Sequence, residues 1–212
     1  MFIGYFNLAN TVTLLGLASA IMAIFCANQG LYTLALVMLL FAGFCDMFDG
    51  RIARNLRGRL RRDKVYGIQL DSLADMVSFG VVPALLAYNM GFKGVADLLV
   101  YLFFIICGAV RLAYFNTQAL TDTKDLNVRF YTGAPIPFSC VFFPLLFIMT
   151  IFIKNPETTV WIFRAFFVLL GIAYVLRIKI KKFGAKFLLS TVAFDLICLI
   201  IIAFSGEPNL FT

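Results

Sequence analysis

Long apolar runs alternate with short polar segments along the whole chain. The runs lie near residues 10–27, 31–49, 70–90, 95–115, 134–153, 158–176 and 186–204. Each is close to the roughly 20 residues that an α-helix needs to cross a hydrocarbon core of about 30 Å. Turn and breaker residues such as Asn155-Pro156 separate the runs. The pattern predicts an all-α integral membrane protein, a bundle of about six to eight transmembrane helices in which we assign the seven runs above.

Composition supports the membrane class. Hydrophobic residues make up 62% of the 212 positions, whereas soluble domains are about 45–50% apolar. The mean hydropathy is +0.96. No loop is long enough for a soluble domain, so residues 1–212 are expected to form one transmembrane domain. The first residues show no charged segment with a small-residue cleavage site, so no removable signal peptide is expected.

The basic residues predict an orientation, because short cytoplasmic loops carry an excess of Lys and Arg. Seven basic residues fall within 50–69, and others fall within 116–133 and 177–186. The opposite loops carry only Lys93 and Lys154. We therefore expect a multi-pass protein of the cytoplasmic (inner) membrane, with its basic loops and N-terminus on the cytoplasmic side. The net charge of +7 is read as this topology signal, and basic loops can also attract anionic membrane lipids. Nucleic acid is not an expected partner.

Histidine is missing from the sequence, and the five cysteines stand singly in apolar runs. Catalysis by Ser-His-Asp or Cys-His groups needs an imidazole, and the usual zinc sites need imidazoles or clustered thiolates. Histidine-dependent catalysis and such zinc sites are therefore excluded. A general base in this chain must be a carboxylate, a lysine or a tyrosine.

Four aspartates stand at the ends of two apolar runs. Asp46 and Asp49 are three residues apart and Asp71 and Asp75 are four apart, so each pair shares a helix face. The two spans are antiparallel neighbours, and their pairs should therefore converge at one depth on the cytoplasmic side. Close carboxylates repel, and a divalent cation offsets that charge. Oxygen-only ligands favour Mg²⁺ or Mn²⁺. The alternative is that the four aspartates are helix-end charges neutralised by nearby arginines.

Small and basic residues accompany the aspartates. Gly50 and Ala53 leave room for a phosphate-bearing group to approach the backbone, and Gly67 does the same on the next helix. Arg54 offers a planar fork that can grip phosphate. The alternative for the glycines is close helix packing, which is common in membranes.

Eight of these positions form a spaced pattern, Asp46-x2-Asp49-Gly50-x2-Ala53-Arg54-x12-Gly67-x3-Asp71-x3-Asp75. The pattern resembles the signature of the CDP-alcohol phosphotransferases, integral membrane enzymes that move a phosphatidyl or similar group from a cytidine diphosphate donor to an alcohol. The family usually has a shorter stretch between the arginine and the second glycine. Here twelve residues intervene, within the basic segment NLRGRLRRDKVY.

The resemblance implies roles for these residues. The cytidine diphosphate group would be bound by Asn10, Thr13, Asp46, Gly50, Ala53, Arg54, Gly67 and Asp71. Metal ions would be held by Asp46, Asp49, Asp71 and Asp75. Asp75 would also be the catalytic general base that takes the proton of the acceptor hydroxyl. The acceptor would then displace cytidine monophosphate (CMP) directly, because the motif offers no separate nucleophile.

Three further stretches resemble the branch of the family that uses L-serine: DSLADMVSFGVVPALL (71–86), GAVRLAYFN (108–116) and RFYTGAPIP (129–137). The implied reaction converts CDP-diacylglycerol and L-serine to phosphatidylserine and CMP. The expected acceptor-binding residues are Arg111, Asn116, Arg129 and Thr132. Arg111 or Arg129 could pair with the serine carboxylate, and the alternative for both is a topological anchor.

Two other readings stay open at this point. Within the family, the acceptor could be glycerol 3-phosphate or inositol phosphate. From another class, a divalent-cation transporter would also need intramembrane carboxylates, which would lie near the midplane of broken helices. The family resemblance further implies a homodimer. Arg164 and Asp195 lie inside late spans, where they could pair with each other or line a dimer contact.

Overall fold

The structure is a computed structural model. It describes residues 3–56, 58, 60–121, 130–150, 153, 155–177, 179–181, 190, 193–197 and 199–201. The α-helices are α1 (Leu8–Asn28), α2 (Tyr32–Asn55), α3 (Arg61–Asp75), α4 (Val82–Asn89), α5 (Val95–Thr121), α6 (Phe138–Thr150) and α7 (Pro156–Val175). A π-helical segment, η1 (Met76–Val81), joins α3 to α4. Two short antiparallel strands, β1 (Phe130–Thr132) and β2 (Lys179–Lys181), pair Tyr131 with Ile180.

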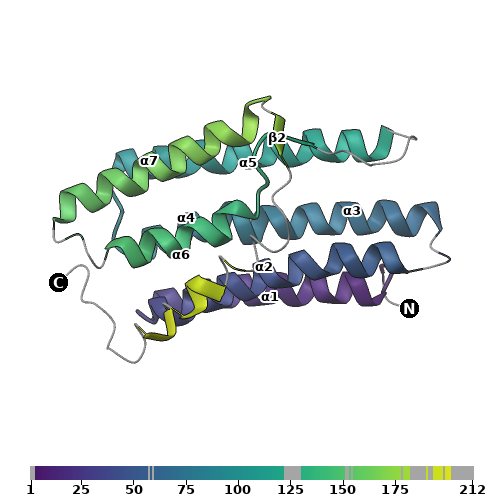
Figure 1. Ribbon diagram of the computed structural model, residues 1–212, viewed down its shortest axis with the longest axis horizontal. Coiled ribbons are helices and arrows are strands. Elements are labelled where there is room, and N and C mark those ends of the chain that lie inside the picture. The colour runs from purple at the N-terminus through teal and green to yellow at the C-terminus, as the bar shows by residue number, and fades with distance from the viewer. Residues whose placement is uncertain are drawn as a thin grey trace.

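The helices lie roughly along one axis and form an elongated bundle (Figure 1). α1 and α2 pack together as an antiparallel hairpin, and α5 packs against α7 on the other side of the bundle. Between these pairs, α3, η1 and α4 make one continuous rod, and α6 contacts α2, η1 and α7. The C-terminal part of α2 and the N-terminal part of α3 therefore lie at the same end of the bundle, and α1 packs against both helices.

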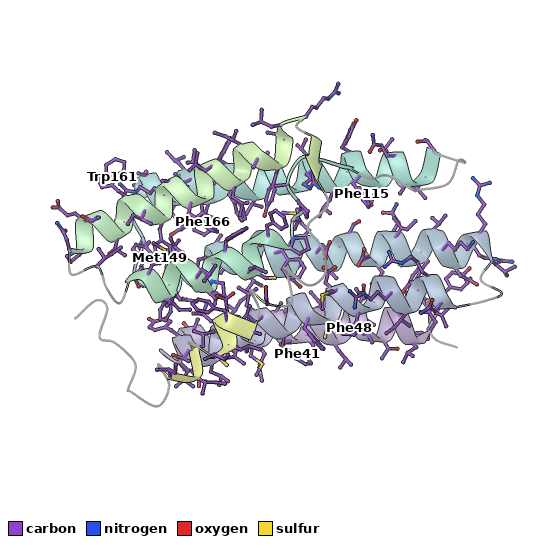
Figure 2. All side chains as sticks on the ribbon, in the orientation of Figure 1. Phe41, Phe48, Phe115, Met149, Trp161 and Phe166 are labelled. Carbon is purple, nitrogen blue, oxygen red and sulfur yellow. The ribbon has the colours of Figure 1, made fainter. Side chains whose placement is uncertain are left out.

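Among the described residues, five helices are long and apolar enough to cross a membrane. They are α1, α2, the α3–η1–α4 rod, α5 and α7, and they coincide with five of the seven predicted spans. The prediction of an all-α multi-pass membrane protein is confirmed. Large apolar side chains such as Phe41, Met149 and Trp161 are exposed on the outside (Figure 2), as expected for a surface that faces lipid.

The predicted span at 134–153 is shorter in the structure. Its helix, α6, has only 13 residues and begins at Phe138. Pro135 and Pro137 precede it, and proline both lacks an N–H and disfavours helical geometry in the residue before it. Ala134 instead donates its N–H to the Ala173 carbonyl of α7 (2.9 Å). Much of the last predicted span, 186–204, lies outside the described residues.

Arg164 is paired with Asp97, which the sequence did not suggest. Its Nε donates to Asp97 Oδ1 at 2.6 Å, and Asp97 Oδ2 accepts the N–H of Gly94 at 2.9 Å. Asp195 is buried, and neither of its carboxylate oxygens has a hydrogen-bond partner among the described residues. The suggested pairing of Arg164 with Asp195 is therefore wrong, because the N-terminal end of α5 supplies the carboxylate.

Gly43 lets α2 approach α6 closely. A Cβ at this position would overlap the Sγ of Cys140, a buried residue of α6, whereas a Cβ at Gly50 on the same helix would meet nothing within 4 Å. We expect Gly43→Val to lower the free energy of unfolding by about 1–3 kcal/mol through overpacking. Thermal or denaturant unfolding in detergent measures this loss, with Gly50→Val as the matched control. Equal destabilisation by the two substitutions would contradict the close α2–α6 contact.

Candidate active site

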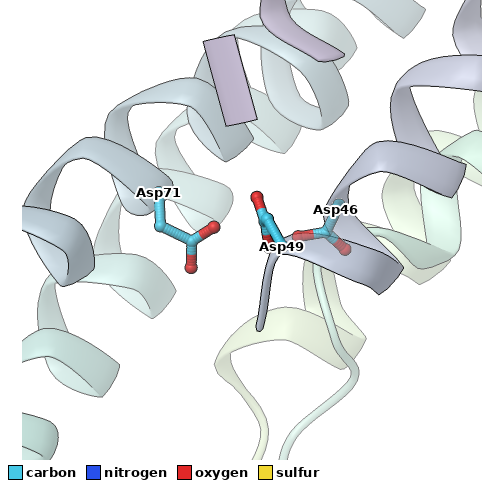
Figure 3. Close-up of side chains that lie close together, drawn as sticks. All are labelled: Asp46, Asp49 and Asp71. Atoms are coloured by element: carbon cyan, nitrogen blue, oxygen red, sulfur yellow. The ribbon is translucent and has the colours of Figure 1, made fainter. Parts of the chain in front are cut away.

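Three aspartates meet between α2 and α3. One carboxylate oxygen from each of Asp46, Asp49 and Asp71 lies within 4.8 Å of the other two. Figure 3 shows Asp71 reaching from α3 toward the two side chains of α2. Asp75 lies one helical turn beyond Asp71, and it lines a small cavity together with Asp46 and Asp49. The structure thus brings together the four carboxylates that the sequence singled out.

Helix periodicity explains this convergence. On α2, Asp46, Asp49, Gly50 and Ala53 follow the spacing i, i+3, i+4 and i+7, which places them on one face. The facing stripe of α3 contains Lys64, Gly67, Ile68 and Asp71 at the same spacing. α2 and α3 run in opposite directions, and residues of both stripes line the same cavity, so the stripes face each other across the site.

The donor set fits a hard divalent cation. Asp49 is 5% exposed, and its Oδ2 accepts the hydroxyl of Thr13 at 2.5 Å. Carboxylates this close in a buried setting repel strongly, because the effective dielectric constant is far below that of water. Ligand oxygens stand about 2.0–2.6 Å from Mg²⁺ or Ca²⁺, so oxygens across such an ion are separated by about 4–5 Å. The 4.8 Å cluster is compatible with a divalent ion held by Asp46, Asp49 and Asp71.

A cavity of about 510 Å³ opens beside the cluster. It is lined by Ala9, Asn10, Thr13, Asp49, Gly50, Ala53, Arg54, Leu56, Lys64, Gly67, Ile68 and Asp71. Seven of the eight residues expected to bind the cytidine diphosphate group are among them. The eighth, Asp46, lines a much smaller adjoining cavity with Asp75 and Ser78, and Asp49 borders both cavities.

The lining includes a cation that sequence analysis did not assign to the site. Lys64 was counted only as a topology signal, although its spacing of three and seven residues from Gly67 and Asp71 puts it on the same helix face. The structure also distinguishes between the two explanations for Gly50, close helix packing and space for a ligand. Since a Cβ there would meet nothing within 4 Å, close helix packing does not explain this glycine, and its small size enlarges the cavity.

The expected acceptor-binding residues are not gathered in this cavity. Asn116 accepts the hydroxyl of Ser72 at 2.7 Å and so faces a different side of α3 from Asp71. The guanidinium of Arg111 lies beside the turn at Gly133, because a Cβ added to that glycine would be 2.7 Å from Arg111 Nη1. Thr132 belongs to β1. Arg129 lies outside the described residues.

The helix that carries Asp75 changes geometry directly after it. The π-helical segment η1 begins at Met76, and such segments often occur at functional sites. Ser139, the second residue of α6, donates its hydroxyl to the Phe79 carbonyl of η1 at 2.7 Å. Neither the π-helix nor this contact between residues 60 positions apart has a recognisable signal in the sequence.

Comparison with known proteins identifies the class. Residues 6–179 match the family model of the CDP-alcohol phosphatidyltransferases. The chain therefore belongs to this family, and the resemblance inferred from the spaced motif is confirmed.

Its relatives include several proteins that share one name. A CDP-diacylglycerol–serine O-phosphatidyltransferase of Helicobacter pylori is 33% identical over 184 residues, which cover 82% of this chain and 71% of that protein. The protein of that name from Mycobacterium bovis is 32% identical over 181 residues, 84% of this chain and 62% of its own length. The Saccharomyces cerevisiae protein is 43% identical over 99 residues, 45% of this chain and only 34% of the yeast protein.

Proposed function

We propose that this chain transfers the phosphatidyl group of CDP-diacylglycerol to L-serine, giving phosphatidylserine and CMP. The observation that carries the proposal is the cluster of Asp46, Asp49 and Asp71 beside a cavity lined by the family motif. The relatives named for this reaction support L-serine as the acceptor.

The cavity suits the polar part of the donor. Arg54 and Lys64 supply positive charge on two sides of it, and Gly50 and Ala53 leave space for a phosphate or sugar. Asn10 and Thr13 add hydrogen-bonding groups from α1. We assign the cytidine diphosphate group to this cavity, with its diphosphate toward the aspartates.

Mg²⁺ or Mn²⁺ would be held by Asp46, Asp49 and Asp71, with Asp75 adjacent. A bound divalent ion offsets the charge that develops on the diphosphate as CMP departs. Thr13 fixes the orientation of the Asp49 carboxylate through its hydrogen bond, so the side chain is already aligned before a ligand enters.

Asp75 is the proposed general base. The serine hydroxyl gives its proton to the Asp75 carboxylate while its oxygen forms a bond to the phosphorus of the phosphatidyl group. The bond from that phosphorus to the CMP oxygen breaks, and CMP leaves with the electron pair. Asp75 suits this part because it lies deeper than Asp71 and lines the small cavity, away from the large one. We assign the serine carboxylate to Arg111, whose guanidinium can bind it through two hydrogen bonds.

We further propose that the site faces the cytoplasm from the inner membrane, because Arg54 and Lys64 line it and the sequence between residues 50 and 69 is rich in basic residues. The protein is proposed to act as a homodimer with one site per protomer, as the family resemblance implies.

The function is tested by release of CMP from CDP-diacylglycerol by the purified protein in detergent. We expect release with L-serine and Mn²⁺ or Mg²⁺, and none after exhaustive chelation. Glycerol 3-phosphate and inositol phosphate serve as parallel acceptors. Preference for either of these would replace serine as the assigned acceptor, and full activity without metal would remove the proposed role of the cluster. Metal transport without CMP release would favour a transporter.

The role of Asp75 is tested by comparing two matched substitutions. Asp75→Asn retains the shape of the side chain but cannot accept the serine proton, so turnover should fall by about 10²–10⁴-fold while CDP-diacylglycerol still binds. Asp46→Asn should weaken metal and donor binding together. Turnover and donor binding are measured for both variants. Near-normal turnover of Asp75→Asn, or a loss of donor binding as complete as that of Asp46→Asn, would refute the general-base assignment.

A further inference from the structure

Two buried hydroxyl groups connect α7 to the helix that carries Asp75. Tyr174 of α7 is 2% exposed and donates its hydroxyl to the Ile136 carbonyl at 3.0 Å. Ser139 is fully buried and donates to the Phe79 carbonyl of η1 at 2.7 Å, with the Ile136 carbonyl also nearby at 3.2 Å. Tyr174 and Ser139, here called the hydroxyl pair, thus join α7, the start of α6 and η1.

The hydroxyl pair links the surroundings of Arg111 to the helix segment that follows Asp75: the end of α7 packs beside Arg111 at Gly133, and Ser139 bonds the carbonyl of Phe79, four residues after Asp75. At Gly133, whose φ is +78°, an added Cβ would meet Arg111 Nη1 at 2.7 Å and the Tyr174 carbonyl oxygen at 2.9 Å. The Arg111 guanidinium, the turn at Gly133 and the end of α7 are therefore packed together without room for another side chain.

Packing alone does not account for these hydroxyls. The Tyr174 ring contacts Phe104 (centroids 5.5 Å apart), and a phenylalanine ring would serve as well there. A hydroxyl buried in an apolar bundle is unfavourable unless it is hydrogen-bonded. Here the acceptors are carbonyls of irregular backbone: Ile136 precedes Pro137, and Phe79 belongs to the π-helix. The bonds therefore fix two segments that regular helix hydrogen bonding leaves less constrained.

We propose that Tyr174 and Ser139 are positioning residues for the acceptor half of the reaction. They hold the segment 133–136 and Arg111 at a fixed place relative to Asp75, so that one amino-acid acceptor can present its carboxylate to Arg111 and its hydroxyl to Asp75. This inference rests on the proposed function, and it assigns a role to α7, which lies beyond the spaced aspartate motif.

The chain contains a matched control for the test. Tyr101 of α5 is also buried, 7% exposed, and also donates its hydroxyl to a backbone carbonyl, that of Phe92, at 3.1 Å. Its ring packs against Phe167 of α7. Tyr174→Phe and Tyr101→Phe each remove one hydroxyl from the α5–α7 region, but the Tyr101 hydroxyl bonds Phe92 and not the segment 133–136.

The experiment measures kcat and KM for L-serine and for CDP-diacylglycerol, together with the thermal unfolding temperature in detergent. Tyr174→Phe should raise the KM for L-serine about three- to tenfold, the effect of one lost hydrogen bond, and leave the KM for CDP-diacylglycerol within about twofold. Tyr101→Phe should change neither KM by more than about twofold, with a similar shift in unfolding temperature. Equal serine KM values for the two variants, or equal loss for both substrates, would overturn the proposal.

Ser139→Ala provides the second, independent variant and decides the matter if Tyr174→Phe does not fold. It should also raise the KM for L-serine selectively. In the double variant, the fold-increase should be smaller than the product of the single effects, because both residues serve one connection. Multiplicative effects would contradict a shared connection. A wild-type protein inactive with L-serine would overturn the proposed function itself, whereas an active wild type with unselective variants would overturn only the positioning role.

Discussion

Mutual repulsion among closely spaced carboxylates is the constraint around which this bundle is organised. One carboxylate oxygen from each of Asp46, Asp49 and Asp71 lies within 4.8 Å of the other two, and Asp75 lines a small cavity with Asp46 and Asp49. Such a group lowers stability unless protons or cations offset its charge. Its presence in an apolar bundle therefore indicates a ligand that brings positive charge. A divalent ion meets that requirement, and it can also bind the diphosphate of the donor.

The rest of the fold holds this arrangement in place. α1 supports the cluster through the hydrogen bond from Thr13 to Asp49. The facing stripes of α2 and α3 provide both the carboxylates and the small residues that leave a cavity of about 510 Å³. On the other side of Asp75, the hydroxyl pair fastens η1 and the start of α6 to α7. The proposed donor and acceptor regions thus lie on opposite sides of one helix.

Most of the correct predictions from the sequence came from local periodicity. Spacings of three and four residues placed the aspartates on common faces, and the apolar runs located five long helices. The features that the sequence did not predict depend on contacts between distant segments, and local patterns do not reveal such contacts. Arg164 pairs with Asp97, which is 67 positions away in the sequence. Asn116 accepts a hydrogen bond from Ser72 and does not line the large cavity. Two prolines shortened α6, because apolar composition alone does not show where a helix can begin.

The metal-binding role of the aspartate cluster is tested most directly by the thermal unfolding of the wild type and of Asp71→Asn, each in chelator and in Mn²⁺. A ligand that binds only the folded state raises its stability. We expect Mn²⁺ to raise the unfolding temperature of the wild type clearly and that of Asp71→Asn much less. In chelator, we expect Asp71→Asn to be at least as stable as the wild type, because one repelling charge has been removed. An unfolding temperature that does not respond to Mn²⁺, or an Asp71→Asn variant less stable than the wild type in chelator, would refute this role of the cluster.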